Sequence, residues 1–341
     1  MGMTEPSHNR AKRRGTSYDV ALRAGVSQSA VSRCFRAGAS IAPSTRARIV
    51  AAANELGYRP NAIAQGLITR RTNLVAVIIS NLTNLYYPEV LAELTERLSE
   101  RGVRVLLFTL RAESEVDEVL DQVWRYQVDG AIVAARLSPA QLRAFDESGT
   151  ALVLYNRDGG IVPVASVSCE FAGGETLLVD GMIASGCRSF AIIGGPQDST
   201  VGEARVEGAR ARLAVAGLKP APIDRGDFSY ESGHAAAHRL LAAYDLDAII
   251  AANDVMALGA MDAARFDFGR IIPDDLSVVG FDGVAPAVWR SYRLTTVRQP
   301  VGRMTAAAIA MLFERIENPD LGPERRLFSG DLLIGSTTRS A

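Results

Sequence analysis

The sequence predicts an α + α/β protein, in which a small helical module at the N-terminus is followed by a much larger α/β domain with two lobes. Apolar residues recur at helical spacing between residues 17 and 57. From Leu74 onward, short runs of consecutive apolar residues alternate with amphipathic helical stretches. The chain has 341 residues, of which 48% are hydrophobic, so it is long enough to form more than one core.

The charge of the chain changes sign at about residue 71. Up to Arg71 there are 12 Lys and Arg residues against 3 acidic ones, whereas the whole chain has a formal net charge of −1. A basic segment of this size suits a polyanion such as DNA, because the counterions that it displaces favour binding to any sequence. We expect residues 1–15 to be a disordered basic tail, but that interpretation does not fit residues 17–57, where the apolar residues are periodic.

The composition excludes several classes of protein. No apolar run reaches 18 residues, and the N-terminus lacks the apolar stretch of a secretory signal, so we expect a cytoplasmic protein with no membrane partner. The three cysteines, Cys34, Cys169 and Cys187, lie far apart and outside metal-ligand or redox spacing. We expect them to be buried as small apolar side chains.

The first predicted helix begins after Thr16. Thr16 and Asp19 have the spacing of a capping box, in which the hydroxyl and the carboxylate satisfy early backbone N–H groups. Gly25 tolerates the positive φ that commonly ends a helix, so the helix has about two turns. Its apolar stripe contains Val20, Ala21 and Ala24.

The second predicted helix is capped by Ser27, and a third runs from Pro43 to Gly57. The second helix turns Ala30, Val31, Cys34 and Phe35 inward and leaves Gln28, Ser29, Ser32 and Arg33 outward. Two short helices joined by a tight turn are typical of a helix-turn-helix, whose second helix enters the DNA major groove. Gln can bridge an adenine edge, Ser can contact a base or a phosphate, and Arg favours guanine. A generic three-helix fragment has the same periodicity, and it is the surrounding positive charge that favours DNA binding.

Two strings in this region carry a family resemblance. Residues 19–33, DVALRAGVSQSAVSR, and residues 57–67, GYRPNAIAQGL, resemble the headpiece and hinge of the lactose/galactose repressor family. The resemblance implies base-reading positions at Gln28, Ser29 and Arg33, with Ser27 and Ser32 available to phosphates or bases. It also implies a hinge helix, formed when two copies meet on an operator, whose DNA-contacting residues are Asn61, Ala64 and Leu67. Leu67 would be an apolar wedge in the minor groove, although a leucine on an ordinary helix face has the same pattern.

Seven apolar runs predict strands in the large domain. They are Leu74–Ser80, Val103–Leu110, Ala131–Ala135, Ala151–Asn156, Ser189–Gly194, Ala248–Asn253 and Leu276–Asp282. Because the runs are continuous rather than alternating, they indicate parallel sheets that are buried on both faces. Seven such units over about 220 residues exceed one comfortable sheet and favour two lobes.

Polar residues follow the predicted strands where a ligand of parallel sheets binds, outside the carboxyl ends of the strands. These residues are Asn81, Arg111, Asn156, Gly194-Gly195, Asn253-Asp254 and Asp282, and the aromatic residues Tyr86, Tyr87, Phe228 and Trp289 lie nearby in sequence. Amides, carboxylates and an arginine beside aromatic rings suit a sugar or another small polar ring compound. Each residue taken alone could equally be a helix cap or a loop residue.

The family resemblance continues through residues 191–196, 251–260, 272–282 and 294–300. It implies a domain similar to periplasmic sugar-binding proteins, with an effector cleft lined by Tyr86, Tyr87, Asn156, Arg205, Phe228, Asn253, Asp282 and Gln299. The expected divisions are a headpiece at 16–59, a hinge or linker at 60–71 and an effector and dimerisation domain at 72–341. Its N-lobe would contain about 72–168 plus 300–330, and its C-lobe about 169–297.

An enzyme would need chemistry that the sequence lacks. There is no Gly-rich phosphate loop followed by Lys-Ser/Thr, no Gly-x-Ser-x-Gly elbow and no paired cysteine motif. His234 and His238 have i,i+4 spacing that could hold a metal, but no third ligand is evident, and an exposed helix face is the simpler interpretation. We therefore expect no cofactor, no metal and no catalysis.

Together these observations predict a transcriptional regulator rather than an enzyme. The expected partners are a homodimer mate, a pseudo-palindromic double-stranded operator and a small effector, most simply a carbohydrate. The effector would change the relation of the two lobes and thereby the affinity for DNA. A periplasmic solute receptor is the alternative, which the added headpiece and the missing secretory signal oppose.

Overall fold

The computed structural model describes residues 15–35, 39–59, 71–80, 82, 84–110 and 115–339, in two compact units, Met1–Thr72 and Asn73–Ala341. The predicted hinge residues Asn61, Ala64 and Leu67 lie outside the described residues. So do Asn81, Arg111 and nearly all of the predicted basic tail.

The first unit contains three helices, α1 (Ser17–Ala24), α2 (Gln28–Cys34) and α3 (Pro43–Glu55). The predicted capping box is confirmed, since the Thr16 hydroxyl accepts a hydrogen bond from the Asp19 N–H, and an Asp19 carboxylate oxygen accepts one from the Thr16 N–H. Gly25 ends α1 with φ 61°, and the Ser27 hydroxyl caps α2. The three helices share one small core, which includes Val20, Val31, Cys34, Ile49, Ala52 and Ala53.

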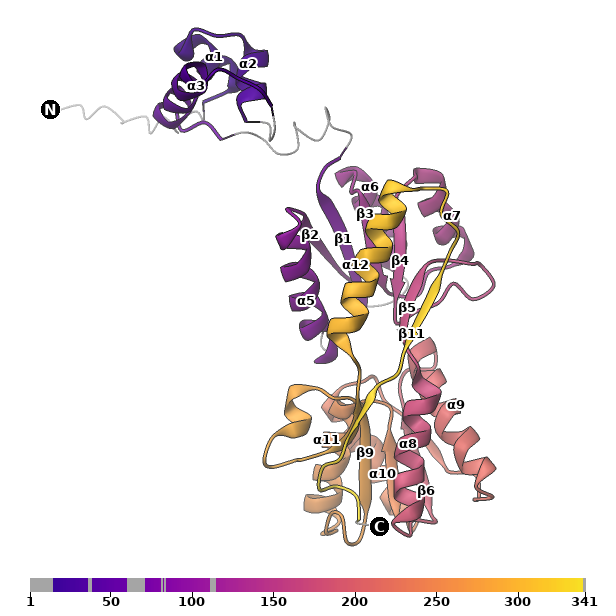
Figure 1. The fold of residues 1–341 in the computed structure, drawn as a ribbon. Coiled ribbons are helices and arrows are strands. Elements are labelled where there is room, and N and C mark those ends of the chain that lie inside the picture. The colour runs from indigo at the N-terminus through magenta and orange to yellow at the C-terminus, as the bar shows by residue number, and fades with distance from the viewer. Residues whose placement is uncertain are drawn as a thin grey trace, which may run out of the picture. The chain divides into compact units, whose positions relative to one another are not determined.

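The first lobe of the second unit is built on a six-stranded parallel sheet. Its strand order is β11 (Arg325–Phe328), β5 (Ser166–Cys169), β4 (Ala151–Tyr155), β3 (Gly130–Ala134), β1 (Leu74–Ser80) and β2 (Arg104–Leu110). Helices α5 (Tyr86–Glu100) and α12 (Val301–Glu317) cover one face of this sheet (Figure 1). Helices α6 (Val116–Tyr126) and α7 (Pro139–Ser148) cover the other face.

The second lobe has a six-stranded sheet with one antiparallel edge. Its strand order is β12 (Asp331–Leu333), β10 (Thr295–Arg298), β9 (Ser277–Asp282), β8 (Ala248–Ala251), β6 (Phe190–Gly194) and β7 (Ile223–Arg225), and β12 runs antiparallel to β10. Helix α8 (Phe171–Ala184) packs beside α9 (Thr200–Val215), and α10 (Tyr230–Ala243) packs beside α11 (Asp254–Asp262). A π-helical turn, η2 (Ala263–Asp267), extends α11, and a short 3-10 helix, η3 (Ala285–Val288), follows β9.

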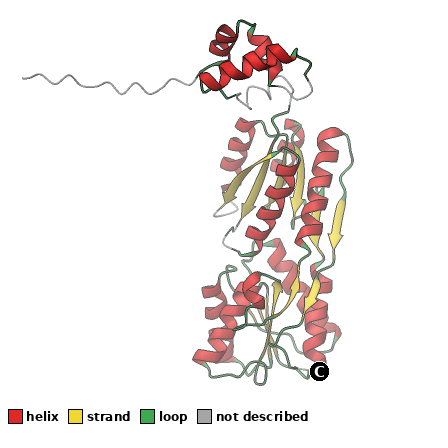
Figure 2. Cartoon of the chain, turned by 60° about the vertical axis from the view of Figure 1, so that its left-hand side comes forward, coloured by secondary structure: helices red, strands yellow, loops and turns green. Residues whose placement is uncertain are grey.

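The chain passes between the two sheets three times. It crosses from β5 to α8, returns from β10 to α12 and crosses again from β11 to β12 (Figures 1 and 2). Neither lobe is therefore a single continuous segment of sequence.

All seven predicted strands form, with ends that differ by at most two residues from the prediction. Five further strands were not predicted: β5, β7, β10, β11 and β12. The three cysteines are buried and unpaired, as expected. No helix within the described residues is long and apolar enough to span a membrane.

Candidate functional site

The outward face of α2 is a polar surface on the first unit. Gln28, Ser29 and Arg33 are exposed, and Ser32 is half-buried. The Gln28 amide donates to the Ser17 hydroxyl at 3.2 Å, and the Ser27 and Ser29 hydroxyls lie 2.9 Å apart. Arg33 makes no hydrogen bond or ion pair with any residue that the structure describes, so its donors are free for a ligand.

Two arginines brace the helices that present this face. Arg46 of α3 donates to the backbone carbonyl of Cys34 at 2.8 Å, which ties the end of α2 to α3. Arg23 of α1 pairs with Glu55 of α3 at 3.0 Å. The predicted base-reading side chains therefore project from a small braced bundle rather than from a free helix.

In the second unit, a chain of buried hydrogen bonds begins in the first lobe. The Tyr86 hydroxyl lies 3.2 Å from the Tyr155 hydroxyl and accepts a hydrogen bond from the Asn156 amide, also at 3.2 Å. Tyr86 starts α5, and Asn156 directly follows β4. The same Asn156 amide donates to the Gln299 side-chain oxygen at 2.8 Å.

The chain of hydrogen bonds then continues into the second lobe. Gln299 lies in the crossing between β10 and α12, and its amide donates to Asp282 Oδ1 at 2.8 Å. Arg205 of α9 forms an ion pair with the same oxygen at 2.7 Å. Tyr86, Asn156, Gln299, Asp282 and Arg205, five of the predicted effector residues, thus form one continuous polar network that joins both lobes.

Two atoms at the end of this network have no partner among the described residues. They are Asp282 Oδ2 and Arg205 Nε, and both are buried. The Arg205 guanidinium lies over the rings of both Phe171 and Phe281, at 5.0 and 4.3 Å from the ring centroids. A buried donor and acceptor without partners cost free energy, and a polar ligand with hydroxyl groups could satisfy both.

Backbone strain gathers at the same place. Asn156, Phe228 and Asp282 have positive φ values of 51°, 70° and 125°. Such conformations cost about 1–3 kcal/mol each for residues other than glycine and cluster at binding sites. The strain supports the assignment of the strand ends as a site.

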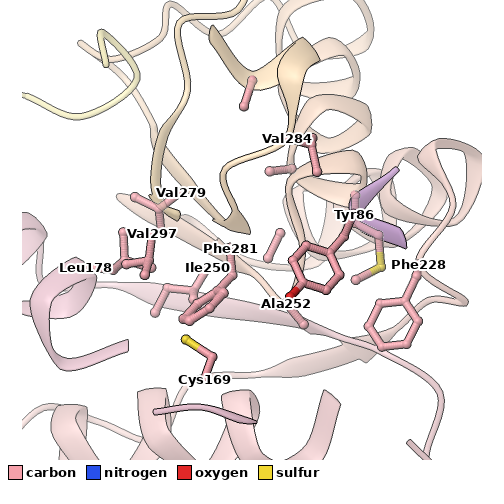
Figure 3. Packing of buried hydrophobic residues seen from close by; sticks show 14 of the residues in the cluster. Tyr86, Cys169, Leu178, Phe228, Ile250, Ala252, Val279, Phe281, Val284 and Val297 are labelled. Carbon is pink, nitrogen blue, oxygen red and sulfur yellow. The ribbon is translucent and has the colours of Figure 1, made fainter. Parts of the chain in front are cut away.

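The remaining predicted cleft residues have structural contacts of their own. Asn253 caps α11, since its side-chain oxygen accepts from the Met256 N–H at 2.9 Å, and its amide donates to the Phe228 carbonyl. The Tyr87 ring packs edge-on against that of Tyr86 at 5.5 Å. Figure 3 shows Tyr86 and Phe228 among the side chains of the large core cluster. Trp289, also named from the sequence, is mostly exposed.

Three buried polar residues near the network were not singled out from the sequence: Ser80, Arg157 and Glu175. Asp254, which was named among the polar residues that follow predicted strands, is buried as well. Asp254 accepts hydrogen bonds from the Thr296 hydroxyl and the Val284 N–H, and burial raises its pKa to about 7. Glu175 on α8 is fully buried, and both of its oxygens lack a partner among the described residues. Burial raises the pKa of Glu175 to about 8, with Arg205 opposing the shift.

The two histidines with i,i+4 spacing contact different side chains. His234 Nε2 lies 3.3 Å from an Asp267 carboxylate oxygen, and the His238 ring packs on Phe268. Within the described residues, no group of three ligand side chains is placed to hold a metal ion.

The comparisons with known proteins cover both units. The family model "Bacterial regulatory proteins, lacI family" matches residues 16–61, and the model "Periplasmic binding protein-like domain" matches residues 179–338. The chain is 33% identical over 334 residues to the transcriptional regulator CelR of Thermobifida fusca, covering 95% of this chain and 98% of the relative. It is 30% identical over 303 residues to catabolite control protein A of Priestia megaterium, covering 87% and 91%.

Two solved structures extend the comparison to three dimensions. The Lac repressor dimer bound to operator and the anti-inducer ONPF matches with a TM-score of 0.87 at 26% identity, over 96% of this chain and 100% of that one. A complex of the regulator CelR with cellobiose matches with a TM-score of 0.72 at 32% identity, over 95% and 100%. These similarities span nearly the whole chain and are to regulators rather than to enzymes.

Proposed function

The chain belongs to the lacI family of bacterial regulatory proteins, and from that premise we propose that it is a transcriptional regulator whose operator affinity is set by a small molecule. The observation that carries this proposal is the buried polar network that joins both lobes. It ends in two atoms that have no partner among the described residues, Asp282 Oδ2 and Arg205 Nε. A ligand that satisfies these atoms alters the contacts between the lobes. We infer that the protein acts as a sensor rather than as an enzyme, since the relatives that it resembles are regulators.

The DNA contacts follow from the polar face of α2. Arg33 would donate to a guanine, while Gln28 and Ser29 contact neighbouring base edges, and Ser27 and Ser32 contact phosphates or bases. We propose that Asn61, Ala64 and Leu67 contact the minor groove, with Leu67 as the apolar wedge.

The proposed effector is a carbohydrate or a related metabolite. The network offers carboxylate, amide and guanidinium groups to hydroxyls, and Tyr86 and Phe228 offer flat apolar surface to a ring. The relative CelR has been seen with cellobiose, which makes this disaccharide the first compound to test. Effector and operator affinities are then coupled, and the coupling is reciprocal.

We propose that the working form is a homodimer. The second lobe exposes large apolar side chains, among them Phe266, Val288 and Trp289, which are 79%, 59% and 58% exposed. Arg265 of η2 donates to the Ser291 carbonyl, so the two segments that carry these side chains are tied together. Exposed apolar surface of this kind is typical of an interface.

Operator recognition can be tested by selection from a random duplex library. The wild-type protein should enrich a pseudo-palindromic sequence, and Arg33→Ala should bind that sequence about 5- to 150-fold more weakly, since a good contact to one base contributes about 1–3 kcal/mol of discrimination. Arg125→Gln, on the exposed side of α6, is the matched control. No enriched sequence, or an unchanged affinity of Arg33→Ala, would rule out the headpiece assignment.

Effector binding can be tested by thermal unfolding with cellobiose and a panel of other neutral sugars. A ligand of the folded state raises the melting temperature. Asp282→Ala should remove that rise, and the same sugar should change the operator affinity of the wild-type protein. If Asp282→Ala bound the sugar as well as the wild type does, the cleft would be misplaced.

A further inference from the structure

A cavity opens beside the polar network. It has a volume of about 460 Å³ and is lined by the segment after β3, by the segment after β4 and by Thr200 at the start of α9. The polar residues that matter to its chemistry are Arg136, Ser138, Arg157, Asp158 and Thr200. The first four come from the first lobe and Thr200 from the second, so the cavity spans both.

Arg157 is a buried cation in this cavity that pairs with no acidic side chain of the described residues. Only 9% of the surface of this residue is exposed to solvent. Its guanidinium donates to the Asn156 carbonyl at 2.9 Å and to the Ser80 hydroxyl at 3.3 Å, both of which are neutral acceptors. No acidic side chain forms an ion pair with it within the described part of the chain.

Arg205, the other deeply buried arginine of this unit, does have a counter-charge. Its carboxylate partner is Asp282, at 2.7 Å. Burying a charge costs free energy unless an opposite charge compensates it. Among the described residues nothing gives Arg157 that compensation, so an anion in the cavity would supply it.

Other residues of the lining also favour an anion. Arg136 adds a second guanidinium, and Thr200 stands in the first turn of a 16-residue helix, where the helix dipole favours negative charge. Asp158 is the acidic residue of the lining; it is exposed, and its Oδ1 accepts a hydrogen bond from the Gly160 N–H. The lining thus contains two arginine side chains and one carboxylate.

We propose that this cavity is a subsite for an anionic group, a phosphate or a carboxylate, carried by the effector. The backbone places the subsite next to the polar network, because Arg157 directly follows Asn156, which belongs to that network. The effector would then be a phosphorylated or acidic sugar, with its ring at the network and its anion at Arg157. The assignment of the anion to an effector rests on the proposed sensor function.

The test uses the full chain and simple anions. Thermal unfolding is followed in increasing sodium phosphate or sodium acetate, with ionic strength held constant by sodium chloride. At an anion concentration ten times Kd, the melting temperature should rise by about 3–6 °C. The rise should be absent in Arg157→Gln and retained in Arg125→Gln. A rise with phosphate but not acetate identifies a phosphate subsite, and the reverse identifies a carboxylate subsite.

Two further variants make the result specific. The headpiece is itself basic, and Arg33→Ala should keep the rise if the anion binds at Arg157. Arg136→Gln changes an exposed residue of the cavity lining and should reduce the rise even if Arg157→Gln folds poorly. The proposal is overturned if neither anion stabilises the protein beyond chloride, or if Arg157→Gln and Arg136→Gln both respond as the wild type does. If operator binding and neutral-sugar binding persist in that case, the proposed function still stands.

Discussion

Replacing Glu175 by Gln should make the protein more stable at neutral and alkaline pH. Glu175 is 1% exposed, and neither carboxylate oxygen has a hydrogen-bond partner among the described residues. Burial raises the pKa of this carboxyl from 4.5 to about 8, and the nearby Asp282 adds to the shift while Arg205 opposes it. Because the charged form is disfavoured in the folded state, folding is penalised wherever the unfolded chain would ionise this group.

The sign and size of the effect follow from the two pKa values. The stability contribution of Glu175 is fully present below about pH 4.5 and is lost as the pH rises to about 8. One pKa unit corresponds to about 1.4 kcal/mol, so the full loss is about 5 kcal/mol, with about 3 kcal/mol already lost at pH 7. Gln has nearly the same shape and never ionises, so Glu175→Gln should avoid this loss.

Urea unfolding followed by circular dichroism at pH 5, 7 and 8.5 measures this effect. The difference in unfolding free energy between Glu175→Gln and the wild type should grow from about 1 kcal/mol at pH 5 to about 5 kcal/mol at pH 8.5. Glu207→Gln, at an exposed position of α9, should show no such trend. A difference that stays constant across this pH range would refute the argument.

Three further predictions concern packing and capping. Gly233→Ala should destabilise the protein by about 1–3 kcal/mol in thermal unfolding, because its Cβ would lie 2.3 Å from the Met256 carbonyl oxygen where α10 crosses α11. Gly181→Ala in α8 should instead stabilise it by about 0.5–1 kcal/mol, since nothing lies within 4 Å of the added Cβ; a loss of stability there would contradict the packing. Thr16→Ala removes the cap of α1 and should destabilise this helix by about 1 kcal/mol. Hydrogen exchange of the first-turn amides should then be faster than in the wild type. Unchanged exchange would contradict the prediction.

The sequence predicted those strands whose side chains are apolar on both faces. Central strands such as β1 and β9 are buried along their length, so their runs of Val, Ile and Ala stand out. The five missed strands are short, and three of them, β7, β11 and β12, lie at sheet edges. β11 and β12 also include exposed arginine or aspartate residues. β5 was missed because it buries Ser166 and Ser168, which no rule of apolar periodicity selects.

The site was predictable where a residue directly ends a strand. Asn156 and Asp282 follow that rule, and the structure brings them into one network through Gln299. Arg157 lies two residues after the end of β4, so the same rule extended by one position would have found it. Glu175 could not, because it lies in the middle of a helix and reaches the neighbourhood of Arg205 only through the packing of α8 on α9.

The three crossings between the sheets have a consequence for protein synthesis. Strand β11 and helix α12 complete the first lobe, yet they follow the whole second lobe in the chain, apart from β12. While the ribosome makes residues 170–300, the face of the first sheet that α12 covers, including Val153 and Tyr155, has no cover from this helix. The second lobe can acquire most of its strands first, and the first lobe closes only when its last helix emerges. Nascent chains paused before residue 301 should accordingly bind chaperones through this bare sheet face.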